Sequence, residues 1–260
     1  MTFSNLATDF ADSLEICRTG ARARRWLQAM TTLGFVSAGI VDDRWLTDYN
    51  AEIDEHARSQ VTKSLFSGLS SGQKIALLTM TRLVEVVVER SLVVIDEPEA
   101  HLHPPLLAAL IRALSDLLAD RNGLAILATH SPVVLQEVPA SCVWKLRRYG
   151  DHLVADRPRL ETFGENVGVL THEVFGLEVT EAGFYRALRD VVNEGLSYDA
   201  VVDRFHSQLG GEARALVRAL IAVREDRRRI VPCHNLFAGR DQGFRCPLRS
   251  AHDRGSWCFD

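Results

Sequence analysis

The stretch Leu92-Val-Val-Ile-Asp-Glu-Pro98 decides the fold, together with a second apolar run, Leu124-Ala-Ile-Leu-Ala-Thr129. Neither run alternates apolar with polar residues, which is typical of strands buried on both faces of a parallel sheet. A helix is predicted between them from Pro104 to about Ala119, because proline suits the first turn of a helix, and Asn122-Gly123 ends it. A third strand is predicted at Cys142-Val-Trp-Lys-Leu146. This order of strands and helices predicts an α/β fold with a partial doubly wound parallel sheet flanked by helices.

The regions on both sides of these strands are predicted to be mainly helical. Apolar residues at helical spacing predict helices over residues 4–31, 72–90, 165–175, 180–194 and 198–223. A short strand is predicted at 34–41, whereas 46–63 is polar and carries no clear pattern. The expected organisation is an N-terminal helical region (1–64), an α/β region (65–158), a helical C-terminal region (159–230) and an irregular tail (231–260).

The composition is that of a globular protein. Apolar residues make up 47% of the chain and charged residues 25%, which excludes a disordered or fibrous protein. The net charge of −4 means that a DNA or RNA interface would have to be a local patch, such as Arg227–Arg229, for which a solvated helix end is the alternative. No apolar run is long enough to span a membrane, and no apolar secretory segment opens the chain, so a cytoplasmic protein is expected.

Asp96 and Glu97 end the first predicted strand. Ligands of open α/β sheets bind at the carboxyl edge of the strands, where these two acids are expected. Adjacent carboxylates at such an edge suit a divalent metal with a phosphate ligand: one acid holds Mg²⁺ through its water shell and the other polarises an attacking water. The alternative is a strand end that carries two solvated acids.

Ser70-Ser71-Gly72-Gln73 directly precedes a predicted helix. The free backbone N–H groups of a first helical turn attract anions, and a glycine lets the backbone approach them closely. The alternative is an ordinary N-cap, since serine is common at that position.

His130 follows the second predicted strand in the sequence Ala-Thr-His-Ser-Pro. Threonine and histidine at this strand's carboxyl end would face the same crevice as Asp96 and Glu97. A neutral histidine there is suited to bonding a terminal phosphate. The alternative is a histidine packed into a loop.

Taken together, these motifs resemble the C-terminal half of an ABC-type ATPase head, over residues 65–146. Leu69–Gln73 resembles the signature motif, Leu92–Glu97 the Walker B strand and His130 the switch histidine. The Glu99-Ala-His-Leu-His-Pro104 extension resembles the SMC- and RecF-like members of the AAA superfamily and related defence ATPases. Glu161-Thr-Phe-Gly-Glu-Asn-Val-Gly168, with the helices after it, resembles the Septu-type antiphage ATPase that is also found beside some retrons.

The resemblance implies an ATPase that uses ATP and Mg²⁺. Asp96 would hold the Mg²⁺ shell, Glu97 would be the general base and His130 would contact the γ-phosphate. The residues that would reach an ATP held by a second protomer are Ser70, Ser71, Gly72 and Gln73. The resemblance also implies a second ATPase head in a dimer or larger oligomer, a partner effector such as a nuclease acting on DNA or RNA, and a role in antiviral defence.

One part of the family's site is missing. The phosphate-binding loop Gly-x-x-x-x-Gly-Lys-Ser/Thr is absent, because none of the three lysines, Lys63, Lys74 and Lys145, follows a glycine. The 60 residues before the signature are too few for the missing half-sheet. We expect a truncated or split gene product, or a degenerate head, with weak or no activity on its own. The alternative function is a non-catalytic module that completes a partner head's ATP site.

The tail concentrates cysteine and histidine. Its residues of these types are Cys233, His234, Cys246, His252 and Cys258. A zinc site is one interpretation, but the spacing contains no paired C-x-x-C. A reduced, irregular tail is the interpretation that we favour.

Overall fold

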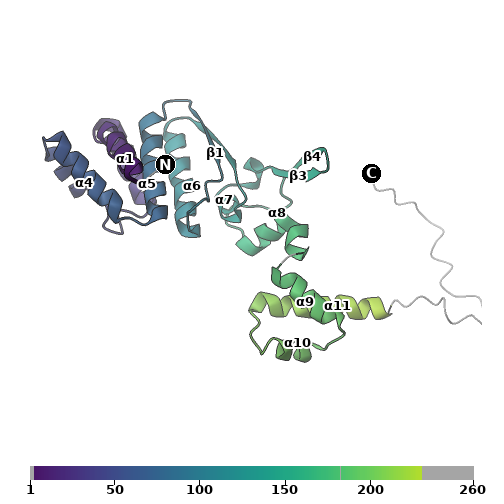
Figure 1. Cartoon of the computed structure of the whole chain (residues 1–260). Coiled ribbons are helices and arrows are strands. Elements are labelled where there is room, and N and C mark those ends of the chain that lie inside the picture. The colour runs from purple at the N-terminus through teal and green to yellow at the C-terminus, as the bar shows by residue number, and fades with distance from the viewer. Residues whose placement is uncertain (1–2, 182, 230–260) are drawn as a thin grey trace, which may run out of the picture. The chain divides into compact units, whose positions relative to one another are not determined.

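The computed structural model describes residues 3–181 and 183–229 (Figure 1). The predicted irregular tail, with its cysteines and histidines, lies outside the described residues. The chain divides into two compact units, with the boundary between Val179 and Thr180. Among the described helices, none has the length and apolar character needed to cross a bilayer.

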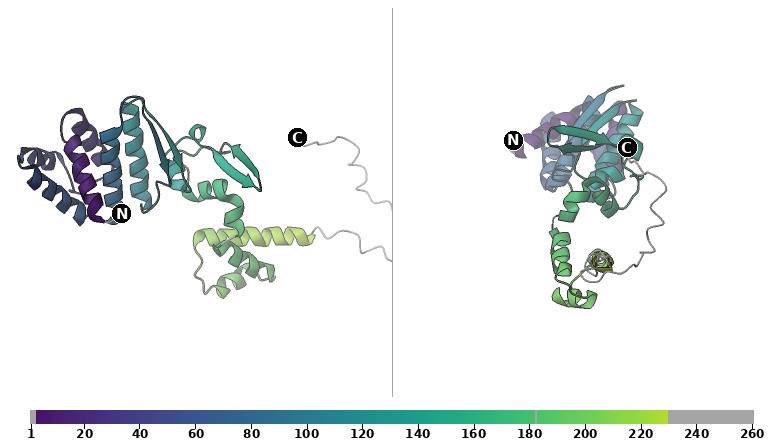
Figure 2. Two further views of the ribbon diagram at one scale, coloured as in Figure 1. Left: turned by 45° about the horizontal axis from the view of Figure 1, so that its top comes forward. Right: turned by 90° about the vertical axis from the view of Figure 1, so that its right-hand side faces the viewer.

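Six helices build most of the first unit. They are α1 (Phe3–Cys17), α2 (Gly20–Thr32), α3 (Asp43–Ala51), α4 (Glu55–Gly68), α5 (Ser71–Val86) and α6 (Pro104–Asp120). The helix predicted over 4–31 is thus confirmed as two helices, and Gly20 adopts the positive φ of +63° at the break. Helices α5 and α6 lie between the other helices and strand β1 (Figures 1 and 2).

Aromatic side chains fill the core of this helical layer. The rings of Phe10 and Phe66 stack with their centroids 5.3 Å apart, and both side chains are buried. Trp26 is also fully buried, and its indole Nε1 donates a hydrogen bond of 2.9 Å to Oγ1 of Thr81 on α5. The core therefore joins α1, α2, α4 and α5, which fixes α5 as the support for the strands beyond it.

The polar segment 46–63, which has no clear apolar pattern, lies in α3 and α4 apart from the short link between them. Asp42 and Asp54 cap α3 and α4 by accepting hydrogen bonds from the backbone N–H groups of Trp45 and His56. Arg58 of α4 is buried, and its guanidinium bonds to the Glu15 carboxylate of α1. Capping and one inward-facing ion pair, in place of apolar periodicity, thus account for these helices.

The prediction of a strand at residues 34–41 is wrong. This segment is a series of turns, in which the N–H of Ile40 bonds back to the carbonyl of Phe35 and the N–H of Ala38 to that of Gly34. Gly34 and Gly39 adopt φ values of +78° and +66°, which β-strands do not use. The apolar residues reflect burial: Phe35 is 2% exposed within the helical core.

The two central strands are confirmed. β1 (Leu92–Asp96) and β2 (Leu124–Ala128) pair in parallel, with Leu92 opposite Leu124 and Asp96 opposite Ala128. Helix α6 connects them as predicted, beginning at Pro104 with His103 as its N-cap. The α/β class is therefore correct, and α6 with the two strands forms the parallel unit that the spacing predicted.

The expectation that these strands are buried on both faces is wrong. Val93, Ile95, Ala125 and Leu127 pack against the helical core. On the other face, Leu92, Val94, Leu124 and Ile126 are 59–72% exposed. The reason is that the described residues of this unit supply helices to one face only, and Figure 2 shows the strands as the outer layer beyond α6.

The third predicted strand does not extend this sheet. Residues Ala140–Cys142 form a 3₁₀ turn (η1) after α7 (Pro132–Gln136). The strand begins only at Lys145 and runs to Tyr149 (β3), where it pairs antiparallel with β4 (His152–Asp156) as a separate hairpin. Among the described residues, β1 and β2 thus form a sheet of two strands.

The segment 161–168, which resembles a defence-ATPase segment, consists of a hydrogen-bonded loop (161–166) and the first two residues of α8 (Val167–Glu181). One carboxylate oxygen of Glu161 accepts hydrogen bonds from the backbone N–H groups of Ala140, Thr162 and Phe163, at 2.8–3.1 Å. These bonds hold the pKa of Glu161 below its usual value. The loop is therefore anchored to the segment after α7.

The second unit is a small helical cluster. It contains α9 (Gly183–Asn193), α10 (Tyr198–Arg204) and α11 (Gly211–Arg229), which agrees with the predicted helical region. Its core side chains are Leu188, Val192, Val201 and Val217. Arg224 of α11 donates to the carbonyls of Val192 and Leu196, and so caps the end of α9.

Candidate functional site

The carboxyl edge of β1 and β2 carries the acidic residues and the histidine that the sequence singled out. Asp96 is the last residue of β1, and the N–H of Glu97 continues the ladder by bonding to the carbonyl of Ala128 at 2.8 Å. Thr129 and His130 follow Ala128 directly. The structure therefore places all four side chains at one edge of the sheet. Asp96, Glu97 and His130 are exposed, so neither acid is desolvated in this chain.

Glu97 has an unusual backbone conformation. Its φ of +49° lies in the left-handed region, which non-glycine residues adopt rarely and at an energetic cost of about 1–2 kcal/mol. His101, in the turn after it, has a φ of +68°. A merely solvated acid at a strand end does not need this conformation. Strained backbone of this kind gathers at functional sites, which favours the functional interpretation of Glu97.

Glu97 and His130 face each other. The Nε2 atom of His130 lies 3.7 Å from Oε1 of Glu97, and their side chains are 78% and 60% exposed. The pair carries opposite charges only when the imidazole is protonated. Two proton-exchanging groups thus lie next to each other, open to a ligand that approaches the strand ends.

Glu99, for which the sequence pattern predicts no role, connects the ends of the two strands. Its Oε2 accepts a hydrogen bond of 2.8 Å from the hydroxyl of Thr129, and its Oε1 accepts one of 2.7 Å from the backbone N–H of His130. The Thr129 hydroxyl in turn accepts from the N–H of Ser131 at 3.0 Å. Glu99 therefore fixes the backbone from which the His130 side chain projects. The sequence signal that could have indicated this role is the position of Glu99, an acid directly after Asp96-Glu97-Pro98.

The Ser70–Gln73 segment begins α5. Ser70 and Gln73 form a reciprocal capping box, in which each side chain bonds to the other's backbone N–H. The N-cap alternative is thus realised in the structure. Ser70 and Ser71 are exposed and Gly72 is buried. Among the described residues, the side-chain hydrogen bonds of Ser70 and Gln73 join these two residues to each other and not to the acids.

Gly72 places α5 against the loop that leaves Glu97. A Cβ atom at this position would lie 3.0 Å from the carbonyl oxygen of His101 and 3.7 Å from a methyl group of Leu106. Glycine is needed here for close packing, whether or not a nucleotide binds. The start of α5 and the turn after β1 are consequently neighbours.

The donor set fits part of a Mg²⁺–ATP site. Mg²⁺ is usually held by one or two carboxylates and otherwise by phosphate oxygens and water, so a single carboxylate such as Asp96 is a suitable ligand. Within residues 3–181 and 183–229 there is no cluster of three or more histidine, cysteine or acidic side chains that would hold a metal by itself. A cradle for the phosphates is missing from the sequence. The described residues are therefore compatible with one metal ligand of such a site and supply no further part of a metal cage.

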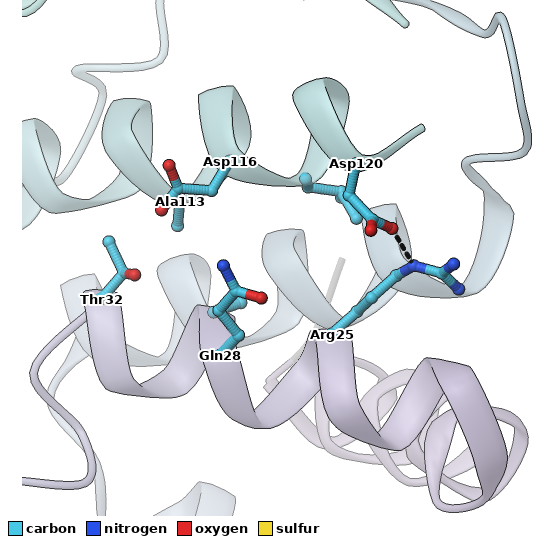
Figure 3. Close-up of a pocket in the computed structure, with 8 residues that line it drawn as sticks. Arg25, Gln28, Thr32, Ala113, Asp116 and Asp120 are labelled. Carbon is cyan, nitrogen blue, oxygen red and sulfur yellow. Dashed lines mark hydrogen bonds and ion pairs between the residues drawn. The ribbon is translucent and has the colours of Figure 1, made fainter. Parts of the chain in front are cut away.

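Two cavities among the described residues lie away from this edge. The groove in Figure 3 lies between α2 and α6, where Arg25 bonds to Asp120, and it has room for about one water (about 10 Å³). A larger hollow of about 320 Å³ in the second unit is lined by Phe184, Leu188 and Phe205 and by no charged side chain.

Burial raises the pKa of the Cys17 thiol to about 12, which excludes it as a nucleophile.

Two comparisons with known proteins bear on this edge. Residues 44–136 match the model of a family described as "AAA domain, putative AbiEii toxin, Type IV TA system". Over 158 residues, 61% of the chain, the sequence is 56% identical to the protein ea59 of Escherichia phage lambda. That stretch amounts to 30% of ea59, so the chain spans less than a third of the relative that it matches.

The family match includes the start of α5, both parallel strands and the histidine after β2. It thus covers the candidate ATP-site residues Ser70–Gln73, Asp96, Glu97 and His130. The match supports an assignment of this segment to the AAA-type P-loop ATPase superfamily, and with it an ATPase-type function.

Proposed function

We propose that this chain carries the hydrolytic half of an ABC-type ATPase head of the SMC- and RecF-like kind. The observation that carries the proposal is the pairing of Glu97 and His130, 3.7 Å apart at the carboxyl edge of two parallel strands. The positive φ of Glu97 and the bonds from Glu99 to the strand beside it support the proposal, because they hold this pair in place.

The residues divide the work as follows. Asp96 holds the water shell of Mg²⁺, which supplies charge neutralisation for the phosphates when it is bound. Glu97 accepts a proton from the water that attacks the γ-phosphate, and His130 donates a hydrogen bond to a γ-phosphate oxygen. The exposed turn Ser70–Gln73 contacts the nucleotide of a second head with its hydroxyl, amide and backbone groups.

The given sequence contains no phosphate-binding loop, so in this proposal most of the nucleotide is held by residues outside it, for which a second ATPase head is the candidate. The proposed assembly is therefore a dimer or larger complex, in which hydrolysis controls a partner effector such as a nuclease acting on DNA or RNA. A family description that names a toxin–antitoxin system supports a role in antiviral defence. The Septu-type assignment is part of this proposal and rests on the sequence of residues 161–168.

Paramagnetic Mn²⁺ with ATP tests the site in the chain itself. We expect weak binding, on the millimolar scale, that broadens the NMR signals of residues 96–99 and 128–131. Asp96→Asn should abolish the broadening, whereas Asp116→Asn, on α6, should leave it unchanged. Uniform broadening, or broadening that survives Asp96→Asn, would contradict the metal assignment.

The catalytic role of Glu97 needs a complete site. The chain should be mixed with full-length ea59, and ATP turnover and retention should be measured. Glu97→Gln should retain ATP and stop turnover that depends on the chain, because the amide accepts no proton. Glu89→Gln, a substitution of an exposed acid after α5, serves as the control. Equal turnover with both variants would refute the role of Glu97 as the base.

A second candidate is a non-catalytic module that only completes a partner head's site. The capping box at Ser70 favours it, because the side chains of Ser70 and Gln73 already bond to each other's backbone N–H groups. In that case, Gly72 and Ser70 variants should impair the partner's turnover, while Glu97→Gln should have no effect.

A further inference from the structure

Five arginines gather at the end of the first unit that lies opposite the carboxyl edge of β1 and β2. Arg90 and Arg121 lie before the amino ends of the two strands, and the N–H of Arg90 donates a hydrogen bond of 2.9 Å to the carbonyl of Arg121. Strands of five residues are roughly 17 Å long, which separates this end from Asp96 and His130. The five residues, here called the arginine patch, are Arg22, Arg24, Arg25, Arg90 and Arg121.

Helix α2 brings three of these arginines to the end of α6. Arg25 bonds to Asp120, the last residue of α6, as Figure 3 shows. That bond, with the positive charges of Arg121 and Arg24 nearby, holds the pKa of Asp120 below its usual value. Arg22 lies three residues before Arg25, so their side chains are neighbours on the helix surface. One carboxylate thus lies among guanidinium groups from two segments of the chain.

The patch carries positive charge that the described residues do not neutralise. Four of its side chains form no hydrogen bond or ion pair within residues 3–181 and 183–229, namely Arg22, Arg24, Arg90 and Arg121. All of these except Arg121 are exposed, and the Nε atom of Arg121 is buried without a hydrogen-bond partner. Five guanidinium groups against the carboxylates of Asp120 and Glu89 leave three positive charges in excess. An anionic ligand is the chemistry that this excess suits.

Helix stability does not account for the arginines at the start of α2. The helix dipole stabilises Arg121 at the end of α6 but opposes positive charges in the first turn of α2. Thr19 has the extended conformation of an N-cap residue, but its side chain makes no capping bond, and the first turn contains no acid. In α5, Gln73 occupies the third helical position and completes a capping box with Ser70. The corresponding position of α2 is Arg22, and local features that oppose stability are expected mainly at functional sites.

We propose that the arginine patch binds the phosphate backbone of a nucleic-acid duplex without reading its bases. Guanidinium groups bond to phosphate oxygens in pairs, and a duplex presents closely spaced phosphates. Single strands are held mainly by bases that stack on aromatic side chains. The elements around the patch offer no such ring, because Trp26 of α2 is fully buried and α5, α6, β1 and β2 contain no aromatic residue.

This inference goes beyond the proposed function, which assigns nucleic acid to a partner effector, and it does not depend on ATP. Fluorescence anisotropy of the full chain with a short labelled DNA duplex, at low salt and without nucleotide, tests it. We expect a Kd in the micromolar range that rises steeply with salt. Arg24→Glu should bind about five-fold more weakly and depend less on salt, whereas Arg24→Lys should bind like the wild type. Arg148→Glu, on the exposed side of the β3–β4 hairpin, makes the same charge change and should have little effect. Equal weakening by Arg24→Glu and Arg148→Glu would overturn the proposal.

Two unlabelled competitors identify the ligand. A duplex RNA of the same length should compete as the duplex DNA does, because only phosphates are contacted. A single strand of dT with the same number of phosphates should compete more weakly. Competition by the single strand that equals that of the duplexes, or failure of duplex RNA to compete, would overturn the assignment to a duplex backbone.

Neutralising the acid of the patch should strengthen binding, which a misfolded variant is not expected to do. Asp120 competes with phosphate for the arginines around it, so Asp120→Asn should bind the duplex about two- to three-fold more tightly. Asp151→Asn, in the exposed turn between β3 and β4, removes the same charge and serves as the control. Equal affinities of the two variants would mean that net charge alone controls binding, which would also overturn the proposal.

Arg22→Gln separates binding from stability. The substitution places glutamine three residues after Thr19, as in the capping box that opens α5, so the chain should melt at or above the temperature of the wild type. Its affinity for the duplex should nevertheless fall about two-fold, because one phosphate contact is lost. A lower melting temperature with unchanged affinity would show that Arg22 serves the fold and not a ligand.

Discussion

Both carboxylate oxygens of Glu99 are used to hold the neighbouring strand's exit, on the Thr129 hydroxyl and the His130 backbone N–H. Removing the side chain in Glu99→Ala leaves both donors without their partner. Hydrogen bonds to charged groups contribute about 1.5–3 kcal/mol, and partial exposure of Glu99 places the expected loss near the lower value. Urea denaturation measures it, and faster hydrogen exchange at the His130 amide should accompany it.

Glu99→Gln separates charge from shape. The amide keeps one accepting oxygen, so we expect a free energy of unfolding between that of the wild type and that of Glu99→Ala. Glu89→Ala, which removes an exposed acid, controls for net charge and should change the stability by less than about 0.5 kcal/mol. If Glu99→Ala unfolds at the same urea concentration as this control, Glu99 does not hold the strand end.

The sequence could place these residues at one edge, but it could not show how they are oriented. Asp96, Glu97 and His130 each end a predicted strand, and the ends of parallel strands meet. The left-handed conformation of Glu97 and the bridge made by Glu99 depend on contacts between segments that lie some thirty residues apart in the sequence. No local pattern encodes such contacts.

Among the elements, α5 meets the loop after β1 through Gly72. In Gly72→Ala, the new methyl group would lie 3.0 Å from the His101 carbonyl oxygen, which is backbone and cannot rotate away. Alanine gains about 1 kcal/mol of helix propensity, but overpacking costs about 1–3 kcal/mol, so a net loss of about 1 kcal/mol is expected.

Gly68→Ala is the matched control, because no atom lies within 4 Å of the added Cβ at the end of α4. It should be neutral or slightly stabilising. Thermal unfolding of the two variants side by side measures the difference. Equal melting temperatures would show that the start of α5 is loosely packed on the loop.

The ion pair between α1 and α4 predicts a dependence of stability on pH. Burial alone would raise the pKa of Glu15, but hydrogen bonds from Arg58 and Arg18 outweigh it and hold the pKa below the ordinary value of 4.5. A carboxylate with a lowered pKa contributes stability above its unfolded pKa, and that contribution is lost as the pH falls through the folded pKa. Wild type should therefore lose stability below about pH 4.5.

Glu15→Gln removes this contribution at all pH values. Its melting temperature at pH 7 should be roughly 2–8 °C below that of the wild type, and the difference should shrink as the pH falls towards 3. Glu55→Gln, on the same helix as Arg58, serves as the control. A constant difference between Glu15→Gln and wild type over this pH range would contradict the assignment.

The sequence predicted the elements whose residues pack locally in a regular pattern, and it failed where the same residues serve another purpose. β1, α6 and β2 have the predicted bounds within a residue or two, because apolar runs and a first-turn proline are local signals. Phe35 and Val41 are apolar because they fill the helical core from a turn. The exposed side of β1 and β2 shows that an apolar pattern indicates that a strand favours apolar contacts on both faces. It does not indicate which residues supply those contacts.

At the scale of the whole molecule, the candidate chemistry belongs to the first unit. Residues 70–131 contain the α5 start, both strand ends and Glu99, and the family match ends at residue 136. The second unit is held by its own small core of Leu188, Val192, Val201 and Val217. So small a unit buries a smaller fraction of its surface than a larger domain does and is marginally stable, so the two units should respond separately to a core substitution.

Leu188→Ala tests this separation. The side chain is 2% exposed, and its truncation should cost about 2–5 kcal/mol, which approaches the whole stability of so small a unit. Hydrogen–deuterium exchange should then become fast throughout α9, α10 and the described part of α11, while α5 and α6 keep their protection. Leu107→Ala, at the equally buried position on α6, should produce the opposite pattern. If either variant speeds exchange in both units together, the chain unfolds as one cooperative body.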